Sequence, residues 1–159
     1  TAGSDEKVQW LTEKLGVDVA INYKTAENLT KALAAAAPQG IDIYFENVGG
    51  EHLEAALAVM NNNGRIPVCG MISQYNATEP SPAPRNLAFI IGKRLLLKGF
   101  IVSDYRDRNG EFFRDMSQWV QEGKVTWEET VYEGIENAPE AFMGLFSGDN
   151  MGKMVVKLG

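Results

Sequence analysis

The chain has 159 residues, 45% of them hydrophobic, which predicts one substantial core and therefore one domain. Its net charge of −6 and pI near 4.8 argue against nucleic-acid or anionic-membrane surfaces, because both need basic patches. One cysteine, Cys69, and one histidine, His52, exclude an internal disulfide, argue against a His/Cys metal site and suit a reducing cytoplasm. No stretch approaches the ~20 apolar residues of a membrane span, and no signal peptide is visible. The chain begins with Thr-Ala-Gly rather than methionine, which hints at a processed or excised piece.

The first third of the chain alternates helical and extended patterns. Ser4 is a good N-cap, Lys7 stands at the third helical position, and Gly16 supplies the stop. The apolar run 41–46, followed by two glycines, is typical of a central parallel strand with helices on both faces. Around it the pattern predicts a strand at 19–23, a helix at 27–37 and a helix at 51–60.

The remaining chain continues this alternation. Residues 61–64 predict a turn, 65–69 a strand, 76–85 a proline-rich loop, 87–94 an apolar helix and 96–102 a buried strand. An amphipathic helix at 111–122 is expected to turn Phe112, Met116, Trp119 and Val120 inward. A short strand near 133, a helix at 138–146, a turn at 148–150 and a strand at 153–158 close the chain. This order predicts an α/β fold with a doubly wound parallel sheet.

A dinucleotide-binding domain of this class opens with a strand, a glycine-rich turn and a helix that receives the pyrophosphate. Neither G-x-G-x-x-G nor G-x-x-x-x-G-K-[ST] occurs in the sequence. If the chain is such a domain, it starts after the phosphate loop, near the end of the second strand. Gly3 and Ser4 then stand where a carboxylate usually reads the ribose, and Lys7 follows them, which suits a 2′-phosphate. An ordinary helix cap with an exposed lysine explains the same residues.

Strand ends offer further candidate contacts, because ligands of open α/β sheets lie outside the carboxyl ends of the strands. Asn47 follows one strand, although it is equally a turn former ahead of Gly-Gly. Tyr23 closes another strand, where a half-buried aromatic is the simpler interpretation. Tyr75 lies on the polar loop 73–76, from which its hydroxyl could reach a ligand.

Other residues near these strand ends are given no chemistry. Cys69 is interpreted as a small core residue, and His52, in a helix's first turn, as a solvated side chain. Glu46 ends its strand without a partner carboxylate at a recognisable spacing, so no acid–base role is assigned to it. No nucleophile elbow or Ser/His/Asp set is present.

Taken together, several segments resemble the zinc-independent medium-chain reductases, most closely the prostaglandin reductase/leukotriene hydroxydehydrogenase family and its bacterial NADP-dependent counterparts. The segments are AGSDEKVQWLTEKLG, INYK, IDIYFENVGG, GRIPVCGMISQYN, GFIV and FSGDNMGKMVVK, in the family's order. The resemblance implies an incomplete Rossmann-type sheet that lacks its first strand and glycine-rich loop. It also implies a nucleotide-binding domain at 1–130, a return segment to the catalytic domain at 131–159, and a substrate-binding half upstream.

The activity that the resemblance implies is NADPH-dependent reduction of the carbon–carbon double bond of an α,β-unsaturated ketone or aldehyde. Tyr75 is the catalytic candidate, because a hydroxyl near the nicotinamide ribose could polarise the substrate carbonyl. Zinc is not expected. The implied NADP contacts are Lys7 at the 2′-phosphate, Tyr23 on the adenosine side, Asn47, the loop residues Cys69, Gly70, Met71, Ile72, Ser73, Gln74 and Tyr75, the backbone of Phe100, Ile101 and Val102, and Asn150.

The resemblance also implies a cytoplasmic homodimer that pairs through the edge near residues 100–102. Without its partner segments the tail is expected to expose Phe142, Leu145, Phe146, Met154 and Val155, and the chain alone is expected to have little activity. Two alternatives stay open. One is a non-catalytic nucleotide-binding or regulatory module, and the other is a related quinone reductase.

Overall fold

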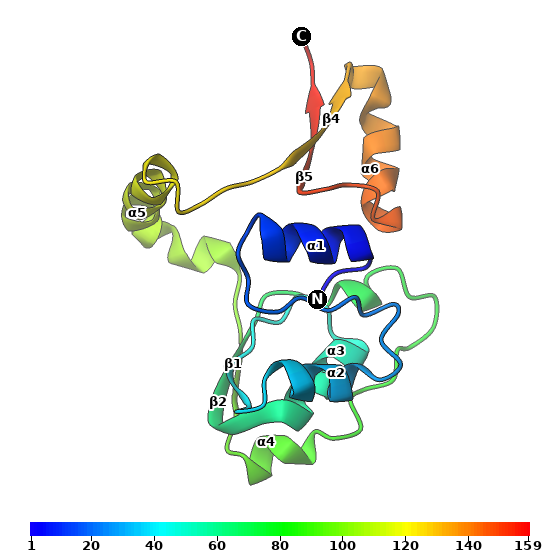
Figure 1. Ribbon diagram of the computed structural model, residues 1–159, viewed down its shortest axis with the longest axis vertical. Helices are drawn as coiled ribbons and strands as arrows, with labels where there is room; N and C mark the ends of the chain where they lie inside the picture. Colours follow the sequence, from blue (N-terminus) through cyan, green and yellow to red (C-terminus); the bar gives the residue numbers. More distant parts are fainter. The chain divides into compact units, whose positions relative to one another are not determined.

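The computed structural model describes residues 1–159, which form two compact units (Figure 1). One unit consists of Thr1–Lys24 and Gly110–Gly159, and the other is Thr25–Asn109. None of the helices has the length and apolar character that crossing a membrane requires.

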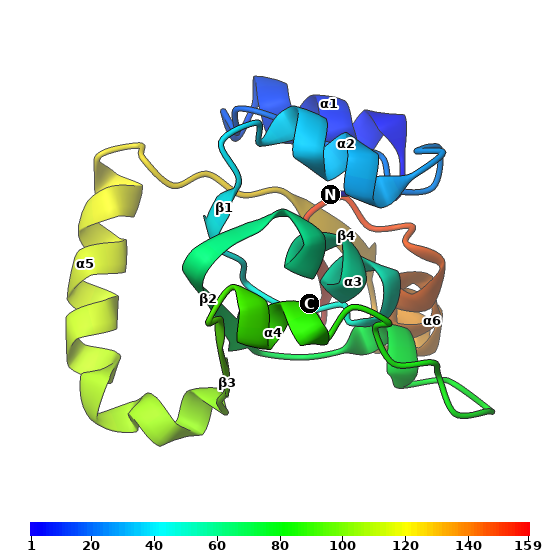
Figure 2. The ribbon, with the colours of Figure 1, turned by 90° about the horizontal axis from the view of Figure 1, so that it is seen from below.

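The unit Thr25–Asn109 is a parallel three-stranded sheet with helical connections, as Figure 2 shows along the path from β1 to β3. The strands pair in the order β1-β2-β3, and both pairings are parallel. Each strand reaches the next through a helix, which is the crossover that parallel pairing demands. The elements are α2 (Leu29–Ala36), β1 (Ile41–Ile43), α3 (Gly50–Val59), β2 (Met60–Val68), η1 (Ile72–Gln74), α4 (Ala88–Gly92), β3 (Leu96–Gly99) and η2 (Val102–Arg108).

The core of this unit lies between α3 and the sheet. Leu53 and Leu57, four residues apart on α3, fall on one helix face and are both buried. They meet Met60 and Ile66 of β2, and Leu95 just ahead of β3. The alternating burial along β2 directs these side chains to the helix-covered face.

The expectation that the strand at 41–46 is central and covered on both faces is wrong. β1 is an edge strand, paired only with β2. Tyr44 packs against the core and Glu46 is buried, but Ile43 and Phe45 are 57% and 53% exposed. A continuous apolar run shows that a segment is extended and hydrophobic, whereas its place in the sheet depends on which partner strands are present.

Two further expectations about strands and one about a turn are corrected. The segment 19–23 forms no regular strand but a single parallel bridge between Ala2 and Asn22, because Ala2 is the only residue that pairs with it. The strand at 96–102 ends at Gly99 and is largely exposed. The turn at 61–64 lies inside β2 as an irregularity, with Asn63 at a φ of 64°. The strand at 65–69 is confirmed as far as Val68, where β2 ends.

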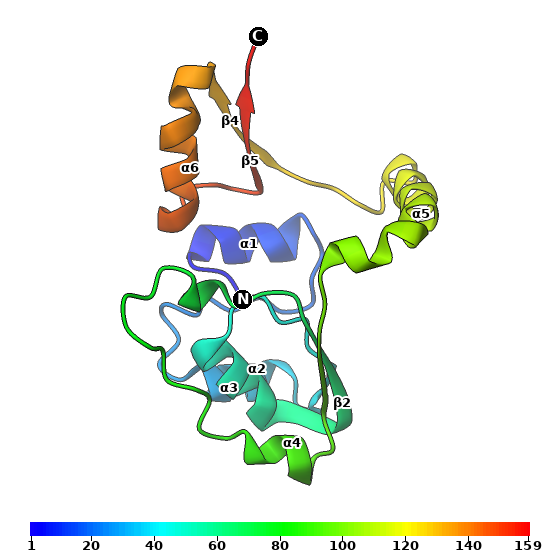
Figure 3. The ribbon, with the colours of Figure 1, turned by 180° about the vertical axis from the view of Figure 1, so that it is seen from behind.

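The unit that contains both chain ends is built from α1 (Asp5–Glu13) and the tail elements. The expected cap is confirmed, since the Ser4 side chain accepts a hydrogen bond from the Lys7 N–H. In the tail α6 connects two parallel strands and lies beside them (Figure 3). The tail elements are β4 (Glu129–Glu133), η3 (Ile135–Asn137), α6 (Ala138–Ser147) and β5 (Lys153–Lys157).

Amphipathic patterns in this unit predict helices better than they predict burial. The helix expected at 111–122 is present as α5 (Asn109–Gln121), but none of its residues is buried. Phe112, Trp119 and Val120 are exposed, so their inward placement is wrong. The apolar tail surface is confirmed for three residues and corrected for two, which are half-buried. The exposed three are Phe142, Leu145 and Phe146, and the half-buried two are Met154 and Val155.

Candidate functional site

A shallow groove of about 440 Å³ lies at the carboxyl ends of β2 and β3. This is the edge at which parallel α/β sheets receive their ligands. Most of the residues that line it belong to the two segments selected from the sequence. The lining residues are Val68, Cys69, Gly70, Met71, Gly99, Phe100, Ile101 and Asp104.

The first segment, residues 69–75, folds back on itself beside the groove. The Tyr75 hydroxyl accepts a hydrogen bond from the Met71 N–H at 3.3 Å. A Cβ added at Gly70 would lie 2.8 Å from the Tyr75 hydroxyl oxygen, so only glycine leaves room for this closure. Tyr75 is 63% exposed, and its phenol is therefore open to a ligand. Ile72, Ser73 and Gln74 form η1 and are also exposed.

The second segment, residues 100–102, follows β3 and is held by ring packing. The Phe100 ring meets Phe45 and Tyr105 edge to face, with centroids 6.0 Å away in each case. The Asp104 carboxylate accepts a hydrogen bond from the Ile101 N–H at 3.2 Å. Val102, which begins η2, is 78% exposed and does not line the groove.

A buried carboxylate organises the turn that joins β1 to α3. Glu46 is fully buried, and its Oε1 accepts hydrogen bonds from the N–H groups of Val48 and Gly49. The Tyr44 hydroxyl donates to the same oxygen, and burial, together with this carboxylate, raises the pKa of Tyr44. The Asn47 side chain is exposed at the tip of this turn.

The turn and the first segment are bonded to each other. The Ile72 N–H donates to the Asn47 carbonyl at 3.0 Å, and the Ser73 N–H and hydroxyl both donate to the Val48 carbonyl. A Cβ added at Gly49 would lie 3.1 Å from Met71 Cβ. The structure therefore brings Asn47, residues 69–75 and the groove residues of 99–104 to one end of one sheet.

Three of the selected residues lie in the other unit. The Lys7 ammonium donates to the Gly148 carbonyl at the C-terminus of α6. The Asn150 side chain donates to the Gly152 carbonyl in the same turn region. The Tyr23 hydroxyl lies 3.3 Å from the position of a Cβ at Gly3, so the ring closes over that glycine.

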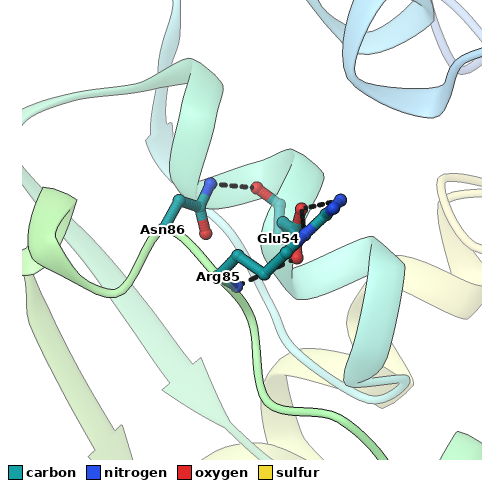
Figure 4. A network of polar contacts seen from close by, with 3 residues as sticks. All are labelled: Glu54, Arg85 and Asn86. Atoms are coloured by element: carbon teal, nitrogen blue, oxygen red, sulfur yellow. Dashed lines mark hydrogen bonds and ion pairs between the residues drawn. The ribbon is translucent and has the colours of Figure 1, made fainter.

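The proline-rich loop is tied down at its far end by a polar network (Figure 4). Glu54 of α3 accepts hydrogen bonds from the Arg85 guanidinium at 2.9 and 3.2 Å and from the Arg85 N–H at 3.0 Å. The Asn86 side chain donates to the Glu54 carbonyl at 2.8 Å. These bonds from Arg85 lower the pKa of Glu54.

Sequence reasoning missed or misplaced four residues here. Glu46 and Asp104 both accept hydrogen bonds from backbone N–H groups. The sequence could have indicated this for Asp104, because it follows Ile101 by three residues at the start of a helical turn, which is the spacing of a capping box. The interpretation of Cys69 as a core residue is wrong, because its side chain is exposed in the groove. His52 is partly buried rather than solvated, and this burial lowers its pKa.

The chain contains no group of three or more His, Cys, Asp or Glu side chains placed to hold a metal ion. The groove is lined by two glycines, Gly70 and Gly99, and by the aromatic Phe100, and the exposed Tyr75 is bonded through its hydroxyl to Met71 of the lining. A site that lets a ligand come close to the backbone and supplies a few polar groups suits a flat organic cofactor. Such a cofactor carries the chemistry itself, and the protein has to orient its reactive ring.

Comparison with known proteins finds relatives that are dehydrogenases or reductases. The zinc-binding dehydrogenase family profile matches residues 1–122. Bovine prostaglandin reductase 1 is 52% identical over 99% of this chain and 48% of its own length, and Escherichia coli NADPH-dependent curcumin reductase is 47% identical over 99% and 47%. The crystal structure of Vibrio vulnificus CurA in complex with NADPH superposes with a TM-score of 0.91 at 45% identity, covering 99% of this chain and 48% of that one. The chain thus spans about half the length of the curated relatives it matches.

Proposed function

The chain belongs to the medium-chain dehydrogenase/reductase superfamily, among its NADP-dependent reductases, and from that premise we propose that it is the cofactor-binding part of an enone reductase. The reaction is the reduction of the carbon–carbon double bond in α,β-unsaturated ketones or aldehydes. The observation that carries the proposal is the groove at the carboxyl ends of β2 and β3, lined by Cys69, Gly70, Met71, Phe100 and Ile101.

In this proposal different residues contact different parts of the cofactor. Lys7 supplies the cation that a 2′-phosphate requires, and Tyr23 contacts the adenosine side. The segments 69–75 and 100–102 contact the nicotinamide part, and Asn47 and Asn150 are further cofactor contacts. Bound NADPH supplies a hydride to the β-carbon of the substrate. Lys7 can exchange its bond to the Gly148 carbonyl for a bond to phosphate, because a charged acceptor makes the stronger hydrogen bond.

Tyr75 has the catalytic role in this scheme. Its hydroxyl accepts a hydrogen bond from the Met71 N–H, and the proton of that hydroxyl is left to donate outward. An outward donor beside the groove can bind the substrate carbonyl and stabilise the negative charge that develops on its oxygen. Protonation of the enolate carbon is left to solvent, since Asp104, the carboxyl group in the groove lining, is bonded to the Ile101 N–H.

The remaining features of the proposal concern domains and assembly. Residues 1–130 serve the nucleotide and 131–159 return to a catalytic domain. Zinc has no part in the reaction, and the protein works in the cytoplasm. A homodimer forms through β3, which is an edge strand with Leu96 58% exposed and is therefore open to further pairing.

The test uses the full natural polypeptide that carries this sequence. We expect it to oxidise NADPH in the presence of an α,β-unsaturated ketone, and to give the saturated ketone as product by mass spectrometry. NADH should be a markedly poorer reductant, and a saturated ketone of the same length should not be reduced. An alcohol as product would contradict the proposal.

Two other outcomes decide for the alternatives. NADPH binding without turnover of any enone indicates a non-catalytic nucleotide-binding module. Turnover of a simple quinone with no turnover of enones indicates a quinone reductase. We expect residues 1–159 alone to bind NADPH weakly and to turn over no enone, and micromolar affinity in a calorimetric titration would refute that part.

A further inference from the structure

We propose that Glu46 is a positioning residue for the cofactor site. Its buried carboxylate holds the turn 47–49, and through that turn it holds the segment 69–75 in the arrangement that binds NADPH. This inference rests on the function proposed above and assigns to that site a residue that itself need not touch the ligand.

The first step of the argument is the environment of the carboxylate. Glu46 is 0% exposed, and its Oε1 accepts hydrogen bonds from the Val48 and Gly49 N–H groups and from the Tyr44 hydroxyl at 3.2 Å. These two N–H groups lie just ahead of the first turn of α3, where helical partners are lacking. The carboxylate therefore fixes the path of the backbone from β1 into α3.

The second step is the connection to the groove. The turn that Glu46 holds presents the Asn47 and Val48 carbonyls to the N–H groups of Ile72 and Ser73. The Glu46 carbonyl itself accepts from the N–H groups of Cys69 and Gly70, at 2.9 and 3.2 Å. A displacement of the turn consequently displaces the segment that lines the groove.

The third step is that a carboxylate is a costly choice for folding alone. Burying an ionised group is unfavourable unless it is fully paired, and Glu46 Oε2 is buried without a hydrogen-bond partner. Serine and asparagine satisfy such N–H groups when they stand at the N-cap itself, but Gly49 occupies that position here, so the acceptor has to reach the N–H groups from Glu46. A buried polar atom without a partner calls for an explanation, and a role in a functional site is one of the recognised ones. Because Glu46 lies beside the groove, we infer that its function is to hold the backbone that forms the groove.

Substitutions that change the length of the Glu46 side chain and its charge independently distinguish this positioning role from a simple requirement for negative charge. Glu46→Gln keeps the side-chain length and an acceptor oxygen, whereas Glu46→Asp keeps the charge but withdraws it by one methylene. Glu46→Ala removes both. The control is Glu27→Gln, which makes the same chemical change at an exposed position of the same unit.

Two measurements are made on the full natural polypeptide. The first is amide hydrogen exchange at Val48, Gly49 and Ile72 without cofactor, and the second is the Kd for NADPH. We expect Glu46→Asp and Glu46→Ala to lose protection at these amides and to bind NADPH at least tenfold more weakly, equal to about 1.4 kcal/mol. Glu46→Gln should stay within about threefold of the wild type, and Glu27→Gln should change neither quantity.

The results that overturn the inference are distinct from those that overturn the proposed function. Unchanged NADPH affinity in Glu46→Asp, or an affinity loss that follows the melting temperature equally in all three Glu46 variants, overturns the inference alone. Failure of the wild type to bind NADPH overturns the proposed function and the inference with it. If Glu46→Ala does not fold, the Asp and Gln variants decide between these results.

Discussion

Gly49 is the residue at which the backbone of the site is most constrained. Its φ of 76° and ψ of −160° lie in a region that is essentially restricted to glycine. Any side chain there costs about 1–3 kcal/mol in backbone strain. A Cβ would in addition lie 3.1 Å from Met71 Cβ and 3.3 Å from Ser73 Oγ, closer than ordinary contact. We therefore expect Gly49→Ala to destabilise the protein by about 2–4 kcal/mol.

The control for this substitution is Gly92→Ala. Gly92 ends α4, and a Cβ there would meet no atom within 4 Å. The added methyl lowers the entropy of the unfolded chain without strain, so this variant should be as stable as the wild type or more stable by up to about 1 kcal/mol.

Urea unfolding followed by far-UV circular dichroism measures both variants, with equal m-values required for the comparison. Since the strain can also be relieved by moving Met71, NADPH affinity is measured alongside. A Gly49→Ala protein within about 0.5 kcal/mol of the wild type, with unchanged affinity, would show that the backbone conformation of Gly49 and its close approach to Met71 do not constrain the turn.

Three further predictions follow from single contacts. The Lys93 ammonium donates to the Leu57 and Ala58 carbonyls at the C-terminus of α3, so Lys93→Met should lower the unfolding free energy by about 1–2 kcal/mol in urea titrations. Tyr75→Phe should lower kcat/KM for an enone about tenfold with little change in the melting temperature, and a larger effect on folding than on turnover would contradict its catalytic role. Because Arg85 lowers the pKa of Glu54, that contact stabilises the fold above the ordinary pKa of 4.5 and is lost as the pH falls through the lowered value. Glu54→Gln should therefore weaken the acid dependence of stability, and identical pH profiles would refute the link.

Local signals in the sequence were sufficient for the elements and for one cap. Ser4 caps α1 as expected, because capping depends on a side chain and an N–H only three residues away. Gly49 and Gly50 predicted the turn after Asn47 from equally local information, because glycine readily adopts the positive φ that this turn requires. The groove segments were selected by family resemblance, and the structure brings most of them together.

Burial and sheet position were not accessible in the same way. The exposure of Cys69 and the edge position of β1 both depend on which distant elements cover a surface, and no local pattern encodes that. Glu46 illustrates the limit for sites. As a strand-end acid it offered no recognisable partner, because its partners are backbone N–H groups that converge only when the turn has formed.

These contacts imply that the site is specified by backbone more than by side-chain chemistry. The hydrogen bonds that join the turn 47–49 to the segment 69–75 come almost wholly from main-chain groups, with Ser73 as the exception. Two glycines, Gly49 and Gly70, make room for the close approach, and one buried carboxylate fixes its origin. Ile72 and Gln74, exposed on the same segment, contribute N–H groups that any residue other than proline supplies. Substitutions should therefore be tolerated at those two positions and not at the glycines, which is the reverse of what a site built from reactive side chains would require.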